Sequence, residues 1–217
     1  MRTFGFPEFL FILEAAQWTL ALSLIAFIGG AALGLVIALM RTSESTWARG
    51  VSTTFIQIFQ GTPLLLQLFL IFFGAPVLGL DINPWIAAGA ALILNSAAFL
   101  GEIWRGCIEA VPRGQWEAAE ALSLKYVARM RDVVLPQAFK IALAPTVGYL
   151  VQIIKGTSLA AIIGFTEITR AGQIINNATF QPLVVFSVVA AIYFVICWPL
   201  SLLAARMERK RAQALAR

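Results

Sequence analysis

The sequence contains no histidine and little charge, and both absences narrow what the protein can be. Of its 217 residues, 60 % are hydrophobic and only 12 % are charged, with a mean hydropathy of +0.85. Such a chain lacks the polar residues that would cover a water-soluble core, so its solvent is predicted to be a lipid bilayer. The missing histidines exclude histidine metal sites and histidine general bases. We expect no catalytic residue and no metal site.

Cysteine is also scarce. The only two, Cys107 and Cys197, stand far apart at or within apolar segments. This placement favours small apolar packing residues over a disulfide or a redox pair.

Five apolar stretches approach or exceed the roughly 20 residues that a helix needs to cross a bilayer. They are residues 17–40, 52–73, 85–104, 139–163 and 183–205. The sequence therefore predicts an all-α membrane protein with five transmembrane helices in a single domain over 1–217. The residues before the first span carry Glu8 and Glu14 and no small-residue cleavage site, so they are predicted to form an interfacial helix rather than a signal peptide.

The distribution of lysine and arginine predicts the orientation, because cytoplasmic loops are enriched in both. Thirteen of the 16 basic residues fall on one side of the five spans, in the first and third loops and the C-terminal tail. Arg2 and Arg170 fall on the other side, and Lys155 lies within a span. We expect the N-terminus outside and the third loop and the tail in the cytoplasm. The tail suits an anionic leaflet and lacks the aromatic residues of a nucleic-acid-binding segment.

The third loop, residues 111–137, is the longest polar interruption in the chain. Pro112 lies at its start and Pro136 lies at its end. Two short helices are predicted between them, with Arg129 and Asp132 as an i,i+3 pair on the second. By periodicity alone, this could be an amphipathic hairpin that only anchors two spans.

The amino-acid sequence of the loop nevertheless resembles the signature of ABC-importer permeases. That signature consists of EAA, three residues, Gly, nine residues, Ile, one residue and Leu-Pro. The matching residues here are Glu117-Ala118-Ala119, Ser123, Val133 and Leu135-Pro136. The resemblance implies a coupling helix that docks on a cytoplasmic ATPase. The coupling residues would be Glu117, Ala118, Ala119, Leu122 and Ser123. Ser123 replaces the family's glycine, which would permit a left-handed turn between the two helices more readily.

The similarity extends over nearly the whole chain. The segments GTPLLLQL, NSAAFLGEIWRG and KGTSLAAIIGFTEITRAGQ look like the polar amino-acid uptake branch of ABC permeases. This resemblance implies a type I importer permease that pairs with a second copy or a close homologue around a central path. It also implies ABC ATPase subunits and an external solute-binding protein. No GxxxxGK[ST] phosphate loop is present, so ATP is expected to bind a partner subunit, with no cofactor in this chain and no enzyme activity.

Polar residues deep in the spans are the candidates for the substrate path. They are Gln60, Thr62, Asn95, Ser96, Gln152, Lys155, Thr157 and Ser158. Gln60 and Gln67 share one polar face of the second span, which Gly61 and Pro63 interrupt near mid-membrane. Two simpler interpretations remain open: a kinked helix whose glutamines bond to neighbouring helices, and a Lys155 that reaches the membrane surface.

Other local patterns carry structural predictions. Gly30 and Gly34 form a small-xxx-small face that favours close helix packing. Glu102 is expected to pair with Arg105 one turn away, and an external helix is expected to carry Glu167 and Arg170 as an i,i+3 pair.

Together these patterns predict a subunit of the bacterial cytoplasmic (inner) membrane that imports a polar amino acid by ATP-driven alternating access. Lys155, without the acid that many relatives have at the position of Gly156, favours a zwitterionic or acidic substrate. One alternative is an ABC permease for another small polar solute. The other, an ion-coupled carrier or channel, would need carboxylates at mid-membrane, and none of the 11 acids falls there.

Overall fold

The computed structural model of the chain describes residues 3–215, and every regular element in that range is a helix. The elements in chain order are α1 (Phe6–Arg41), α2 (Thr46–Gly61), α3 (Leu64–Val77), α4 (Pro84–Glu109), α5 (Arg113–Ala121), α6 (Tyr126–Ala128), η1 (Arg129–Val134), α7 (Leu135–Gly156), η2 (Thr157–Ile163), α8 (Ile168–Thr179) and α9 (Pro182–Leu215). Arg2 and Arg217, which count toward the predicted orientation, lie outside the described residues, as do both ends of the predicted 1–217 domain.

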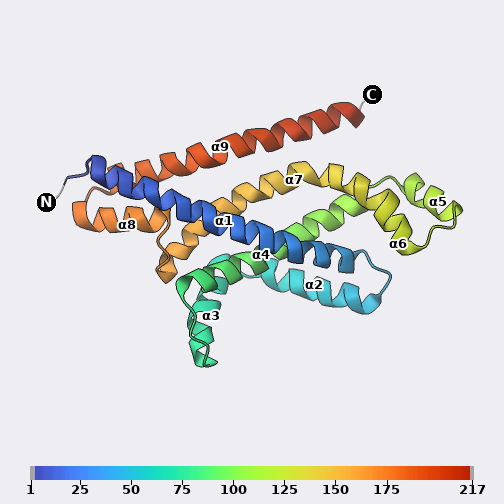
Figure 1. Cartoon of the computed structure of the whole chain (residues 1–217), viewed down its shortest axis with the longest axis horizontal. Coiled ribbons are helices and arrows are strands. Elements are labelled where there is room, and N and C mark those ends of the chain that lie inside the picture. The colour runs from blue at the N-terminus through green and yellow to red at the C-terminus, as the bar shows by residue number, and fades with distance from the viewer. Residues whose placement is uncertain (1–2, 216–217) are drawn as a thin grey trace.

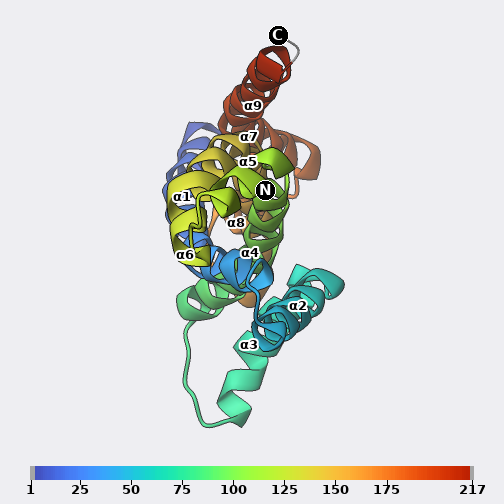
Figure 2. The same cartoon turned by 90° about the vertical axis from the view of Figure 1, so that its right-hand side faces the viewer.

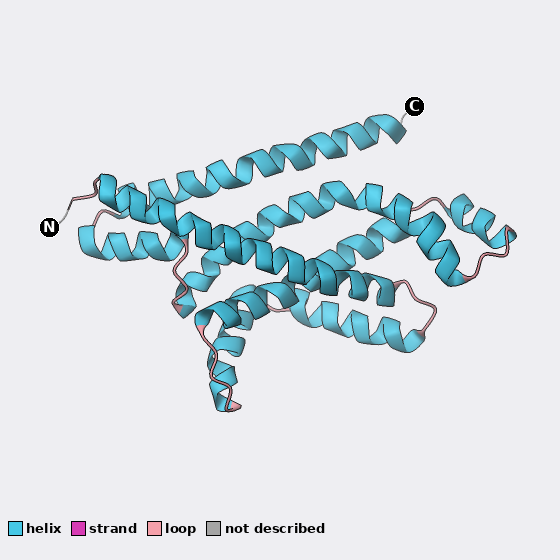
Figure 3. Ribbon diagram, viewed as in Figure 1, coloured by secondary structure: helices cyan, strands magenta, loops and turns pink. Residues whose placement is uncertain are grey.

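The long helices α1, α4, α7 and α9 run along the long axis of the molecule (Figures 1 and 3). The N-terminus and α8 lie at one end, and α5 and α6 lie at the other. The end of α9 points toward the α5–α6 end. Viewed from that end, α3 projects away from the bundle (Figure 2). The loop predicted to couple to an ATPase is therefore held at one tip of the long axis.

α4 is the central element, because it packs against α1, α2, α3, α7 and η2. The close contact between α4 and α1 requires glycine in both helices. A Cβ atom added at Gly30 would lie 2.5 Å from the Cβ of Ser96, and one at Gly101 would lie 2.8 Å from a side-chain carbon of Ile37. Only residues without side chains allow backbones to approach this closely. The predicted packing role of Gly30 and Gly34 is confirmed.

Within residues 3–215, four helical segments are long and apolar enough to cross a membrane, and α2 with α3 makes a fifth if the pair counts as one broken span. The predicted second span, 52–73, is thus not one straight helix, since α2 and α3 meet at 100°. The physical reason is Pro63, which cannot donate a backbone hydrogen bond and prevents the residue before it from staying helical.

The helix predicted before residue 17 is present but is not a separate element. α1 begins at Phe6 and continues without a break to Arg41. Pro7 occupies the first turn, where its missing N–H costs nothing, and no proline interrupts the helix after it. The basic tail likewise continues α9 as helix, as far as Leu215.

Many large apolar side chains lie on the outside of the long helices. They include Leu24, Ile28, Phe194 and Val195, each more than half exposed. A water-soluble protein rarely exposes apolar surface this extensive, whereas a bilayer solvates it well. The two cysteines are free and buried, as predicted.

The predicted Glu167–Arg170 side-chain pair is wrong. The buried Glu167 carboxylate instead caps α8, accepting hydrogen bonds from the backbone N–H groups of Thr169 (2.9 Å) and Arg170 (2.8 Å). The hydroxyl of Tyr193 in α9 also donates to it, at 2.6 Å. Burial raises the pKa of this carboxyl, against the effect of these bonds. The carboxylate is bonded to the start of α8 because the first amides of a helix have no partner within it.

Candidate coupling and path sites

The hairpin between α4 and α7 keeps a left-handed turn without glycine. Ser123 has a φ of +55°. Its N–H donates to the Glu120 carbonyl at 2.8 Å, and the Leu124 N–H donates to the Ala119 carbonyl at 3.1 Å. These two bonds are the Schellman arrangement that ends many helices. The serine therefore adopts the left-handed conformation that the glycine of the signature would permit more readily.

Replacing Ser123 by glycine is expected to stabilise the hairpin by about 1 kcal/mol, since a left-handed residue with a Cβ costs 1–2 kcal/mol. Thermal unfolding of the purified protein in detergent measures the change. Ser123→Ala is the matched control, because alanine keeps the Cβ and should bring no gain. A glycine variant less stable than the wild type would contradict this account of the turn.

The predicted coupling residues fall on two faces of the hairpin. Glu117, Ala118, Leu122 and Ser123 are exposed, with Leu122 75 % exposed at the turn. Ala119 is 2 % exposed, and η1 packs against α5. Val127, in the second arm, is 71 % exposed. The hairpin therefore presents acidic and apolar side chains outward at the tip of the molecule.

The predicted Arg129–Asp132 pair is wrong, and the correction ties the hairpin to the first loop. Asp132 bonds to Arg131, whose hydrogen bonds lower the pKa of its carboxyl. The Arg129 guanidinium lies near Glu44 (3.6 Å) and Glu120 (3.8 Å) and over the rings of Trp116 and Tyr126. The Tyr126 hydroxyl donates to the Thr42 carbonyl at 3.1 Å. Both contacts reach the loop that precedes α2.

At the break between α2 and α3, one glutamine side chain of α3 bonds to residues at the end of α2. The side-chain amide of Gln67 donates to the carbonyls of Phe59 (2.8 Å) and Thr62 (3.0 Å) and to the Thr62 hydroxyl (3.0 Å). Its oxygen accepts a bond of 3.1 Å from Asn95 Nδ2, which also donates to the Phe59 carbonyl at 3.3 Å. The Tyr149 hydroxyl lies 3.5 Å from Asn95 Oδ1. Carbonyls freed where the helix stops are thus bonded by side chains of α3 and α4.

The structure separates the predicted path residues into exposed and buried groups. Gln60, Thr62, Gln152 and Lys155 are exposed in this single chain, and Ser158 is partly buried. Asn95, Ser96 and Thr157 are buried. Gln60 donates to the Ala98 carbonyl at 3.2 Å, so it still has an oxygen to offer.

The hydroxyls at the end of α7 bond within their own helix. Thr157 donates to the Ile154 carbonyl at 2.7 Å, and Ser158 donates to the Lys155 carbonyl at 2.6 Å. A Cβ atom at Gly156 would lie 3.3 Å from Leu64 and 3.6 Å from Leu92. The end of α7 therefore reaches the α2–α3 break, but a side chain at position 156 would face leucines.

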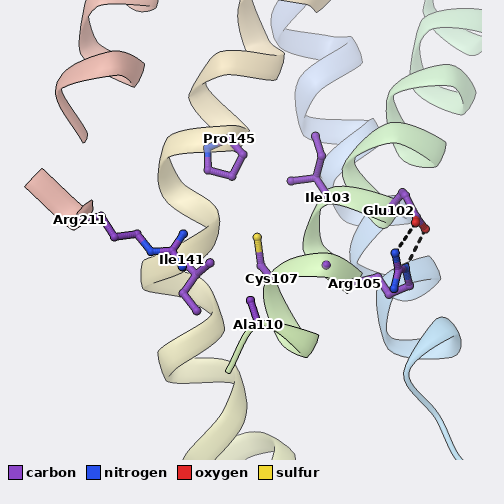
Figure 4. Close-up of a pocket in the computed structure, with 9 residues that line it drawn as sticks. Glu102, Ile103, Arg105, Cys107, Ala110, Ile141, Pro145 and Arg211 are labelled. Atoms are coloured by element: carbon purple, nitrogen blue, oxygen red, sulfur yellow. Dashed lines mark hydrogen bonds and ion pairs between the residues drawn. The ribbon is translucent and has the colours of Figure 1, made fainter. Parts of the chain in front are cut away.

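A cavity of about 510 Å³ opens between α4, α7 and the end of α9, with Cys107, Ile141 and Arg211 among its lining residues (Figure 4). Glu102 lies beside it. The guanidinium of Arg105 approaches its carboxylate to 2.5 Å, so the predicted pair is confirmed. Arg41 lies 3.9 Å from the same carboxylate. Because this acid is neutralised by two arginines, it offers no free carboxylate for ion coupling.

Two residues of the break were not among the predicted path residues. Gln67 is 5 % exposed. Its position on the polar face of the second span could have identified it from the sequence. The contact of Tyr149 could not be predicted from the sequence, because its partner Asn95 lies 54 residues away along the chain.

Comparison with known proteins places these features in a family. The family described as "Binding-protein-dependent transport system inner membrane component" matches residues 11–213. The probable amino-acid ABC transporter permease protein YckA of Bacillus subtilis (strain 168) is 35 % identical over 205 residues, covering 94 % of this chain and 91 % of that protein. The glutamine transport system permease protein GlnP of Escherichia coli (strain K12) is 35 % identical over 206 residues, covering 94 % of each.

The fold agrees with the sequences. The crystal structure of an amino acid ABC transporter with histidines superimposes with a TM-score of 0.88 at 34 % identity, covering 96 % of this chain and 100 % of that one. The permease subunits of this family are transport components and not enzymes, and they work with an ATPase and a binding protein. On these grounds the chain belongs to the family of binding-protein-dependent transport system inner membrane components, as a permease of the amino-acid ABC importers.

Proposed function

We propose that this chain is the transmembrane subunit of an ATP-driven importer that moves a polar amino acid across the bacterial inner membrane by alternating access. The observation that carries the proposal is the hairpin at the tip of the molecule. Its turn is kept by Ser123, and Glu117, Ala118 and Leu122 face outward. In this proposal they enter a groove of an ABC ATPase subunit. The ATPase must hold the hairpin differently in its open and closed states, because a partner shifts an equilibrium only by its differential affinity.

The proposed substrate path runs along the exposed polar group formed by Gln60, Thr62, Gln152 and Lys155. Polar side chains left facing hydrocarbon are costly, so in the membrane this surface requires water or another chain over it. One chain offers too few polar faces to enclose a path. The working unit in this proposal therefore has two permease chains, either identical or homologous, with two ATPase subunits and an external solute-binding protein.

The proposed orientation places the N-terminus outside and the hairpin in the cytoplasm. In support, the hairpin and the end of α9 point toward the same end of the molecule, away from the N-terminus and α8 (Figure 1). Arg206 and Arg209 of α9 would then meet the anionic cytoplasmic leaflet.

The proposed substrate is a zwitterionic or acidic amino acid. Lys155 is exposed at the end of α7, and opposite charges 4 Å apart are worth about 4 kcal/mol at an effective dielectric of 20. Among the relatives, one is named a glutamine permease, and TcyB of Bacillus subtilis (strain 168), 37 % identical over 194 residues and covering 89 % of this chain and 83 % of that protein, is named an L-cystine permease. Neither name is that of an amino acid with a net positive charge at neutral pH.

Uptake competition in cells carrying the complete system tests this proposal. Unlabelled glutamine, glutamate or cystine is expected to suppress uptake more than arginine or lysine does, and Lys155→Gln should weaken that preference about tenfold. Lys155→Arg, which keeps the charge, is the matched control. Stronger competition by arginine or lysine would reject the substrate class. Gly156→Asp is a poor reporter, since its carboxylate would lie against Leu64 and Leu92.

A further inference from the structure

The hydrogen bonds at the α2–α3 break have only one consistent direction. The carbonyls of Phe59 and Thr62 can only accept, so the NH₂ group of Gln67 must face them. The oxygen of Gln67 then faces Asn95 and requires a donor, which sets the Asn95 NH₂ toward Gln67 and Phe59. The oxygen of Asn95 is left to accept from Tyr149. Backbone carbonyls thus determine the orientation of both amides.

This cluster also has no spare donor on either amide. Each NH₂ group has two hydrogens. Those of Gln67 serve the Phe59 carbonyl and the Thr62 residue, and those of Asn95 serve the Phe59 carbonyl and Gln67. Both side chains are nearly buried, at 5 % and 9 % exposure. A fully bonded, buried polar cluster holds one geometry, because losing any of these bonds leaves a polar group of the cluster with fewer partners.

The cluster lies directly behind the exposed path residues. Phe59 and Thr62 flank Gln60 and Gly61, which are exposed, and Gln67 follows one turn into α3. We propose that Gln67 and Asn95 are positioning residues that clamp the α2–α3 break and so set how Gln60 and Thr62 face the substrate path. They bond to the backbone of the path wall and to the Thr62 hydroxyl rather than to the substrate. This inference rests on the path assignment made above.

The test uses the complete importer, with its ATPase and binding protein, reconstituted in vesicles. Cys107 and Cys197 are replaced by alanine, and Gly61→Cys provides one reporter thiol, because a Cβ at Gly61 meets nothing within 4 Å. Two quantities are measured: the rate at which a water-soluble thiol reagent labels position 61, and ATP-driven uptake in the cysteine-free protein.

Gln67→Met keeps the length of the side chain and removes its donors and acceptor. It is expected to lower uptake about tenfold or more and to change the labelling rate severalfold. Asn95→Leu should act in the same direction. The two changes together should be no worse than the stronger one alone, because both remove one cluster.

Thr146→Val is the matched control. It deletes the 2.9 Å bond from Trp104 of α4 to Thr146 of α7, an inter-helix bond away from the break, and should leave labelling at position 61 unchanged. Should Gln67→Met fail to assemble, Asn95→Leu carries the test, since it removes the Asn95 donors from the same cluster and should change the labelling rate in the same direction.

The outcomes separate the inference from the function on which it rests. Unchanged labelling and uptake in Gln67→Met, or equal changes in Thr146→Val, would overturn the clamp while the path assignment stands. A parent Gly61→Cys protein that is not labelled at all would instead reject the path assignment, and the clamp with it.

Discussion

Replacing Glu117 by lysine is expected to lower ATP-driven uptake about tenfold or more while the permease still inserts in the membrane. Glu117 is exposed on α5, one turn beyond the start of that helix at Arg113. The substitution reverses a charge on the surface proposed to enter the ATPase groove, and misplaced charges at an interface commonly cost 2 kcal/mol or more. Uptake by the complete importer in vesicles, at fixed ATP, measures the loss.

The control for this variant is Glu208→Lys. Glu208 is exposed on the basic end of α9, so the same reversal of charge is made toward the same end of the molecule but off the hairpin. It should leave uptake within about twofold of the wild type. If Glu117→Lys retained full uptake with normal dependence on ATP, the hairpin would not be the coupling element. The failure of both variants would point to an effect of net charge.

Replacing Gly30 by leucine should prevent the permease from folding. The first atom of the new side chain would lie 2.5 Å from the Cβ of Ser96, and 3.3 Å from its backbone carbonyl carbon. α4 cannot yield easily, because it also packs against α2, α3 and α7. Overpacking costs 1–3 kcal/mol even where neighbours can shift, and a whole leucine at this crossing should exceed about 3 kcal/mol.

The yield of monodisperse protein in detergent and its melting temperature report this loss. Gly106→Leu is the matched change in α4, at a position where an added Cβ meets nothing within 4 Å and which lines the cavity near Arg211. It should be recovered in near-normal amount. Normal yield and melting temperature for Gly30→Leu would show that α1 and α4 do not cross as closely as described.

Patterns that act within a turn or two of helix were predictable from the sequence. The Glu102–Arg105 pair is one, because residues three apart on a helix face each other whatever surrounds them. The turn at Ser123 is another, since the glycine of the signature would permit a left-handed residue there and Ser123 adopts that conformation. The bilayer as solvent followed from composition, and the helical class followed from the length of the apolar stretches.

Other local patterns misled because a competing partner was available. Arg129 and Asp132 have the spacing of an ion pair. The Arg129 guanidinium instead lies over the rings of Trp116 and Tyr126 and near Glu44, which belongs to another loop. Glu167 has the same spacing to Arg170, yet the free amides at the start of α8 take its carboxylate. The spacing of two residues in the sequence shows whether they are neighbours on one helix. It does not show whether a residue from another element, or a free backbone amide, is a better partner.

What the sequence by itself determined was the solvent, the helices and the hairpin between α4 and α7, since each depends on residues close together in the chain. The 100° angle at Pro63 and the Gln67–Asn95–Tyr149 cluster were decided only by tertiary structure. Proline dictates that a helix must stop, but the direction of the next helix depends on which distant side chains bond to the carbonyls that the stop leaves free. At membrane depth no water can replace those bonds, so the packing of α3 and α4 sets the geometry.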